Sequence, residues 1–188
     1  MNKNDLISEL NSFKTAERAH RDKSAKFVLD HPESFPFLVE LVFEDQKRIN
    51  IKAAWVFELV CFEDLDLISP HLDYFTQNLS KIKDESSLRP IAKVCSFIAN
   101  AHYGKSGSKF FNKLNKKGIL LMIENNFDWL IEEHKVASKA FAMDTLFLFG
   151  RETNWVHEEL KLILEKNIGN ESAGYKSHAK KILKALNS

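Results

Sequence analysis

The chain has 188 residues, 44% of them hydrophobic, which suits one compact domain or one short repeat array with a real core. Its 27 basic and 26 acidic residues nearly cancel, whereas nucleic-acid-binding proteins usually show a clear basic excess. The balance argues against nucleic acid as a partner. The two cysteines, Cys61 and Cys95, lie in apolar runs, which is typical of buried thiols in a reducing compartment rather than of a disulfide framework.

The N-terminal residues are polar, and no apolar run approaches the length needed to cross a bilayer. We therefore expect a cytoplasmic protein that does not enter a membrane. A monomer or a weak dimer is the expected oligomeric state.

Helical periodicity runs through the sequence, and alternating strand patterns are absent. In chain order, apolar spacing and breakers predict ten helices, over about 4–13, 15–30, 33–44, 50–62, 70–82, 87–103, 116–132, 135–149, 154–167 and from 170 onward. A further short helix is expected near 110–114.

Particular residues give local signals within this pattern. Ser69 reads as an N-cap with Pro70 at the first helical position, Pro90 is expected in the first turn of its helix, and Gly150 fits a C-terminal cap. The helix over 50–62 is apolar nearly all round, so we expect it to be the most buried, with Trp55 largely enclosed.

Four helices open with a segment of the same outline, in which a base is followed three residues later by a mostly small residue and then by an apolar stretch. The bases are spaced by 37, 50 and 37 residues, at Lys52, Arg89, Lys139 and Lys176. Recurrence at this period predicts stacked hairpins, each an A-helix, a tight turn and a B-helix. The expected fold is all-α, a right-handed α-α superhelix of about four hairpins with an N-terminal helix pair. It forms a single domain over 1–188, divided into 1–31, 33–62, 68–103, 109–149 and 153–187.

An acid precedes each recurring base by a few residues, as Glu171 precedes Lys176. We interpret this as a ladder in which a base at one B-helix start reaches an acid in a neighbouring turn, although a ligand-binding role for the same bases stays open. The charge is also polarised along the chain. Residues 40–66 hold seven acids against three bases, whereas the last helix is basic.

Glu58 and Asp144 are lone acids within strongly apolar B-helices, and Lys93 is a lone base in a third. A buried charge without a partner is costly, so each must be paired or must face a groove. B-helices line the concave face in arrays of this kind, so Glu58, Lys93 and Asp144 are the candidate binding residues. The alternative is that they pair with one another, pair with backbone ends, or point to solvent.

The repeat pattern resembles the HEAT and armadillo class of α-α superhelices over roughly residues 33–187. More narrowly, the chain resembles a family of small bacterial helical-repeat proteins often labelled adenylosuccinate lyase, through the blocks AAWVFELVC, PHLDYFTQN, RPIAKVC, FDWLI, KAFAMDTLFLFG and ELKLILE. The mobile signature loop of the lyases has no counterpart in this sequence. No catalytic residue is therefore carried over.

The first functional hypothesis is a non-enzymatic scaffold that binds a protein or peptide on its concave face, with no cofactor and no metal. The second is a HEAT-like DNA-binding protein or alkylated-base glycosylase, because Trp55, Glu58 and Lys93 loosely suggest such a site. A remote third is adenylosuccinate lyase activity. The seven histidines show no i, i+4 pair of the kind that a helical metal site uses.

Overall fold

The computed structural model describes residues 2–104, 110 and 113–187. These residues form ten α-helices and no β-strand. The α-helices are α1 Lys3–Asn11, α2 Arg18–Asp30, α3 Phe35–Val42, α4 Lys47–Glu63, α5 Leu72–Asn78, α6 Glu85–His102, α7 Lys116–Ile131, α8 Val136–Phe149, α9 Asn154–Asn167 and α10 Ala173–Leu186. Short 3-10 turns flank them at Pro32–Ser34, Leu65–His71 and Leu79–Lys81. The predicted short helix near 110–114 lies partly outside the described residues.

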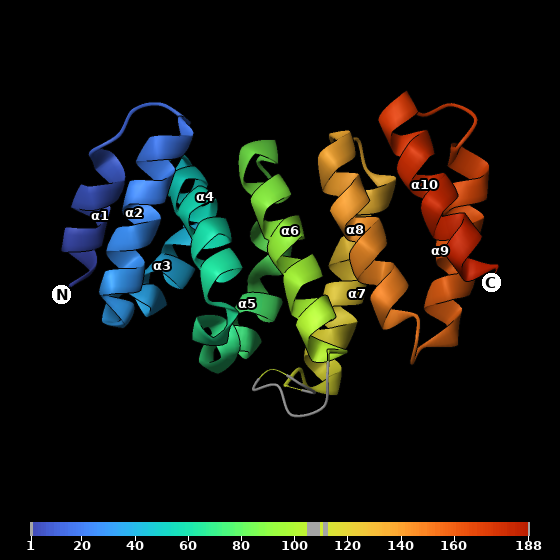
Figure 1. The fold of residues 1–188 in the computed structure, drawn as a ribbon, viewed down its shortest axis with the longest axis horizontal. Helices are drawn as coiled ribbons and strands as arrows, with labels where there is room; N and C mark the ends of the chain where they lie inside the picture. Colours follow the sequence, from blue (N-terminus) through green and yellow to red (C-terminus); the bar gives the residue numbers. More distant parts are fainter. Residues whose placement is uncertain (1, 105–109, 111–112, 188) are drawn as a thin grey trace.

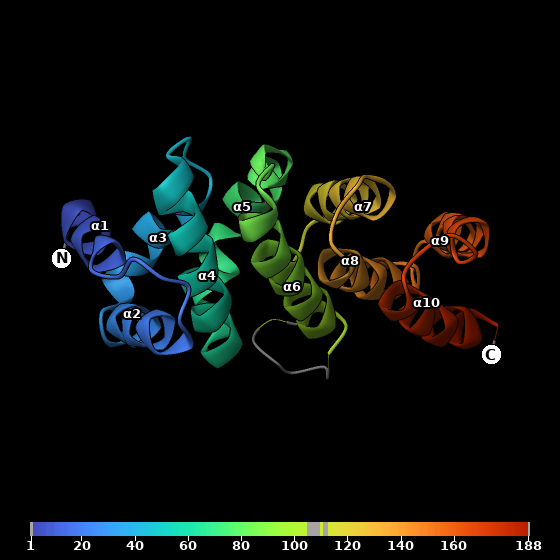
Figure 2. The ribbon, with the colours of Figure 1, turned by 90° about the horizontal axis from the view of Figure 1, so that it is seen from above.

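The helices form two layers (Figures 1 and 2). In one layer α2, α4, α6, α8 and α10 pack side by side in chain order, and the odd-numbered helices lie behind them. The core fills the space between the layers, with Val56, Phe57 and Val60 of α4 completely buried in it. We call the solvent-facing side of the even-numbered helices the B face. No helix in the described part of the chain is both long enough and apolar enough to span a membrane.

Polar side chains begin several helices by accepting hydrogen bonds from otherwise unpaired backbone N–H groups. Asn2 and Asp5 form a capping box at α1, and Asp84 caps α6 through the N–H of Ser86. The predicted start at Ser69 and Pro70 is wrong. The helical turns there begin earlier, at Leu65, because Asp64 accepts from the N–H of Asp66 at 3.1 Å.

Pro90 lies in the second turn of α6, because that helix begins at Glu85, earlier than expected. Proline has no N–H, so the carbonyl of Ser86, four residues back, lacks its usual intrahelical donor. The indole Nε1 of Trp55 on α4 donates to this carbonyl at 2.9 Å. A hydrogen bond between helices thus replaces the one that proline removes.

Gly150 ends α8 as predicted, and its backbone φ of −63° is ordinary for any residue. The position requires glycine for a different reason. A Cβ placed there would lie 1.8 Å from Cδ2 of His157, whose ring stacks on Phe147 and whose Nε2 is 2.7 Å from the Phe147 carbonyl. Contact between the end of α8 and the start of α9 therefore excludes any side chain.

Candidate functional site

One side of α4 forms a row of side chains along the B face. Arg48, Ile51, Trp55, Glu58 and Phe62 recur at intervals of three or four residues, opposite the side that enters the core. The row spans about 21 Å, at 1.5 Å of rise per residue. The expectation that Trp55 is largely buried is therefore wrong, because one side of α4 faces solvent. Phe62 is 62% exposed, and Trp55 is only partly buried.

Glu58 lies between Trp55 and Phe62 in the row and pairs with two bases of α6. Its Oε2 is 2.9 Å from Nη2 of Arg89, and its Oε1 is 2.7 Å from Nζ of Lys93. The Glu58 side chain is 5% exposed, whereas those of Arg89 and Lys93 are 39% and 27% exposed. Two of the three candidate binding residues therefore contact each other, at the seam between α4 and α6.

Asp144, the third candidate, lies on α8 and pairs with another helix. Its Oδ1 is 2.9 Å from Nε2 of His178 on α10. The side chain of Asp144 is 35% exposed and that of His178 is 23% exposed. This pair forms a separate feature of the even-numbered layer.

An aromatic pair ends the α4 row at its C-terminal side. The rings of Phe62 and Phe97 lie 5.9 Å apart across the seam between α4 and α6. Nζ of Lys93 lies 5.8 Å from the centre of the Phe62 ring and 5.5 Å from that of Phe97. The result is an exposed apolar surface with a cation held at its edge.

A basic groove begins the row at its N-terminal side. It has a volume of about 600 Å³ and is lined by Lys14, Arg48, Ile51, Lys52 and Trp55. Lys52 also donates to the carbonyl of Leu10 at 2.9 Å. The groove therefore combines three bases with the side of an indole ring, and its lining includes no acid.

The guanidinium of Arg21 on α2 adds a fourth base, 5.8 Å from the centre of the Trp55 ring. Its Nε is buried and has no hydrogen-bond partner among the described residues. Burial, and then the charge of Arg48, lower the pKa of Lys52 below its usual value of 10.5. Positive charge is thus concentrated around Trp55, and none of these four bases forms an ion pair with a described acid.

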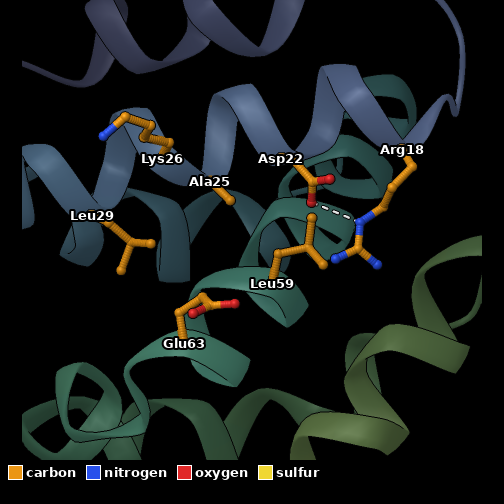
Figure 3. A pocket seen from close by; sticks show the side chains of 7 residues that line it. All are labelled: Arg18, Asp22, Ala25, Lys26, Leu29, Leu59 and Glu63. Atoms are coloured by element: carbon orange, nitrogen blue, oxygen red, sulfur yellow. Dashed lines mark hydrogen bonds and ion pairs between the residues drawn. The ribbon is translucent and has the colours of Figure 1, made fainter.

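A second groove, between α2 and α4, differs in charge (Figure 3). It has a volume of about 400 Å³, and both Asp22 and Glu63 line it. Arg18 lies in the same groove but pairs with Asp22 at 2.7 Å. Lys26 also lines this groove, so two bases and two acids share it, whereas the lining of the basic groove includes no acid.

The buried thiols are poorly suited to nucleophilic chemistry. Burial raises the pKa of Cys95 to about 12, and that of Cys61 rises well above its ordinary value for the same reason. Within the described part of the chain, no three His, Cys, Asp or Glu side chains gather in a group that could hold a metal ion.

Sequence reasoning missed most of this surface, namely Lys14, Arg21, Arg48, Phe62 and Phe97. One signal was available, since Ile51, Trp55, Glu58 and Phe62 follow the spacing of a single helix face. Comparisons with protein-family models, with curated proteins and with solved structures found no match to this chain.

Proposed function

We propose that this protein is a non-enzymatic binding module, built as a right-handed superhelix of HEAT-like hairpins, that binds a protein or peptide segment on its B face. The observation that carries the proposal is the exposed ring of Phe62 against the partly buried ring of Phe97, with Lys93 at the edge of the pair. An exposed aromatic beside a fixed cation is a surface that binds apolar and polar groups together.

The form of the α4 row adds support. It is about 21 Å long, which matches some six residues of extended peptide at about 3.4 Å each. The hydrogen bond from Trp55 to Ser86 and the two ion pairs of Glu58 fix the side chains along it. A row that is ordered before binding loses less conformational entropy when a ligand arrives.

The second candidate function is DNA binding or removal of an alkylated base, and the bases around Trp55 favour it. The state of Glu58 weighs against the catalytic form, because its carboxylate is buried and held by both Arg89 and Lys93. We expect only weak, non-specific affinity for duplex DNA, with a Kd of roughly 10⁻⁴–10⁻⁶ M. Nanomolar binding with a steep salt dependence, or release of an alkylated base, would put this function first.

Selection of random peptides on the protein, followed by affinity measurement, tests the proposal. Phe62→Ala should weaken binding of the selected peptides about tenfold or more, a loss of about 1.4 kcal/mol. Leu162→Ala on α9 is the matched control, because Leu162 is also 62% exposed but lies in the other layer. The affinity of the Leu162→Ala variant for the selected peptides should stay within about twofold of that of the unmodified protein.

Two results would overturn the proposal. One is a selection that yields no binding peptide. The other is a set of peptides whose binding depends on Leu162 and not on Phe62, which would place the binding surface on the odd-numbered layer.

A further inference from the structure

The bases within α6 and α8 pair with carboxylates, as in the pairs Arg89–Glu58 and Lys139–Glu171. The basic groove is different. Lys14, Arg21 and Arg48 make no ion pair with any described side chain, and Lys52 donates to a backbone carbonyl. Four bases thus lie around one indole ring, and none of them forms an ion pair with a described acid.

This arrangement carries an electrostatic cost in the free protein. Like charges brought together disfavour the charged form, and the lowered pKa of Lys52 reflects both burial and the neighbouring Arg48. The buried Nε of Arg21 is also an unsatisfied donor. A bound anion would relieve the repulsion and could supply the missing acceptor.

We propose that the basic groove binds the acidic end of an amphiphilic peptide segment, whose apolar end lies on Phe62 and Phe97. This inference rests on the proposed function and names the class of partner. The α4 row has the required polarity, with bases at Lys14, Arg48 and Lys52 at one end and aromatic rings at the other. The ligand that fits is an extended segment of about six residues with carboxylates at one end and large apolar side chains at the other.

The surroundings favour a peptide over a nucleic acid. A phosphate backbone carries a negative charge at every nucleotide and needs a continuous basic track. Here the purely basic surface is short, because Asp22 and Glu63 accompany the bases of the second groove and an apolar surface follows along α4. A peptide that is acidic at one end only meets no such repulsion.

Fluorescence anisotropy with fixed peptides tests the inference. The probes are a labelled hexapeptide of three glutamates followed by three leucines, the reversed sequence, and both sequences with glutamine in place of glutamate. The variant Lys14→Gln/Arg48→Gln removes two exposed bases of the groove. The control Lys180→Gln/Lys181→Gln removes two exposed bases of α10 and changes the net charge equally.

Of the two glutamate peptides, the one with the higher affinity should bind at least about tenfold more tightly than the same sequence with glutamine. The groove variant should abolish this difference in affinity. The α10 control should show the same difference as the unmodified protein, to within about twofold. Salt should weaken the glutamate peptide selectively, because exposed charge pairs are screened.

Equal binding of glutamate and glutamine peptides, or equal loss in both double variants, would overturn this inference while leaving peptide binding itself intact. A short DNA oligonucleotide that displaces the labelled peptide at a lower concentration than the unlabelled peptide does would also overturn this inference, in favour of nucleic acid. Failure of the proposed function is distinguishable, because then neither these probes nor the selected library would yield binding that depends on Phe62.

Discussion

Glu58 shows at the level of one residue how a candidate binding group can be structural. Its carboxylate is 5% exposed and lies between Arg89 and Lys93. Glu58→Gln removes the negative charge and leaves two cations facing a neutral amide. We expect a loss of about 1–3 kcal/mol in the free energy of unfolding. This loss is smaller than that for breaking a fully buried ion pair, because both bases are partly exposed.

Urea denaturation measures this loss, and Asp144→Asn is the matched control. The pair of Asp144 and His178 is more exposed, so its loss should cost no more than about 1 kcal/mol. A smaller effect for Glu58→Gln than for Asp144→Asn would show that Glu58 is not held as the ion pairs suggest, and would return it to the candidate binding residues.

His102 gives a second prediction at this scale. It is 3% exposed, lies edge-on against Tyr103 at 4.9 Å, and burial lowers its pKa below the usual 6.5. As the pH falls, the imidazole of His102 is therefore protonated in the unfolded chain at a higher pH than in the folded protein. Its contribution to stability is complete above pH 6.5 and is lost as the pH falls below that value.

Unfolding free energies between pH 7.5 and 5 should decline less steeply for His102→Gln than for the unmodified protein. Part of the decline should remain, because burial also lowers the pKa of His71. Parallel curves for the two proteins would contradict the buried, neutral state of His102.

At the scale of the element, one hydrogen bond between α4 and α6 can be tested separately from the ion pairs of Glu58. Trp55→Phe keeps most of the ring but removes the N–H that donates to Ser86. We expect a cost of about 1 kcal/mol. Pro90→Ala restores a backbone N–H to α6, so the same Trp55 substitution should cost less in that background, with a coupling of about 0.5–1 kcal/mol by double-mutant cycle. Strictly additive effects would mean that the carbonyl of Ser86 does not need the indole.

The joint between α8 and α9 should tolerate no side chain at Gly150. Gly150→Ala places a methyl group against His157, so we expect a loss of about 1–3 kcal/mol from overpacking. Gly169→Ala is the control, because no atom lies within 4 Å of the added Cβ. Thermal melts of the two variants should separate clearly, and similar melting temperatures would contradict the close contact at His157.

The sequence predicted the helices well, because their apolar spacing and caps are local. The predicted helix over 154–167 agrees with α9 residue for residue, whereas α6 begins earlier than expected because Asp84 caps it. Trp55 was harder to place. Its neighbours in the sequence are apolar, and only the packing of α2 and α6 against α4 shows which side stays open.

Charge was predicted least well, because a count along the chain does not say which face a residue occupies. The acids near the start of the array include Glu40 and Glu44, but these two pair with Lys3. Arg48 of α4 instead lines the basic groove, and Arg21 of α2 lies over the ring of Trp55 beside it. A region that is acidic by count therefore presents a basic surface on the B face.

At the scale of the molecule, polar contacts recur at the seams between the even-numbered helices. Glu85 of α6 binds His134 at 2.9 Å and Ser138 at 2.7 Å, and Lys139 of α8 binds Glu171 at 2.9 Å. Only the last contact fits the predicted ladder of helix-start bases and turn acids. These partly buried contacts favour one register of each helix on the next, which keeps the B face in a defined shape.

The central claim is that ligands bind on the B face beside Trp55, and the three tryptophans offer a direct test. Trp55 borders the basic groove, Trp129 is 3% exposed in the core, and Trp155 is 48% exposed on α9 of the other layer. Nitrogen-15 spectra of the indole N–H groups should be recorded during titration with the two glutamate–leucine hexapeptides. We expect the Trp55 signal to shift, while those of Trp129 and Trp155 stay in place. A shift of the Trp155 signal with an unchanged Trp55 signal would contradict it.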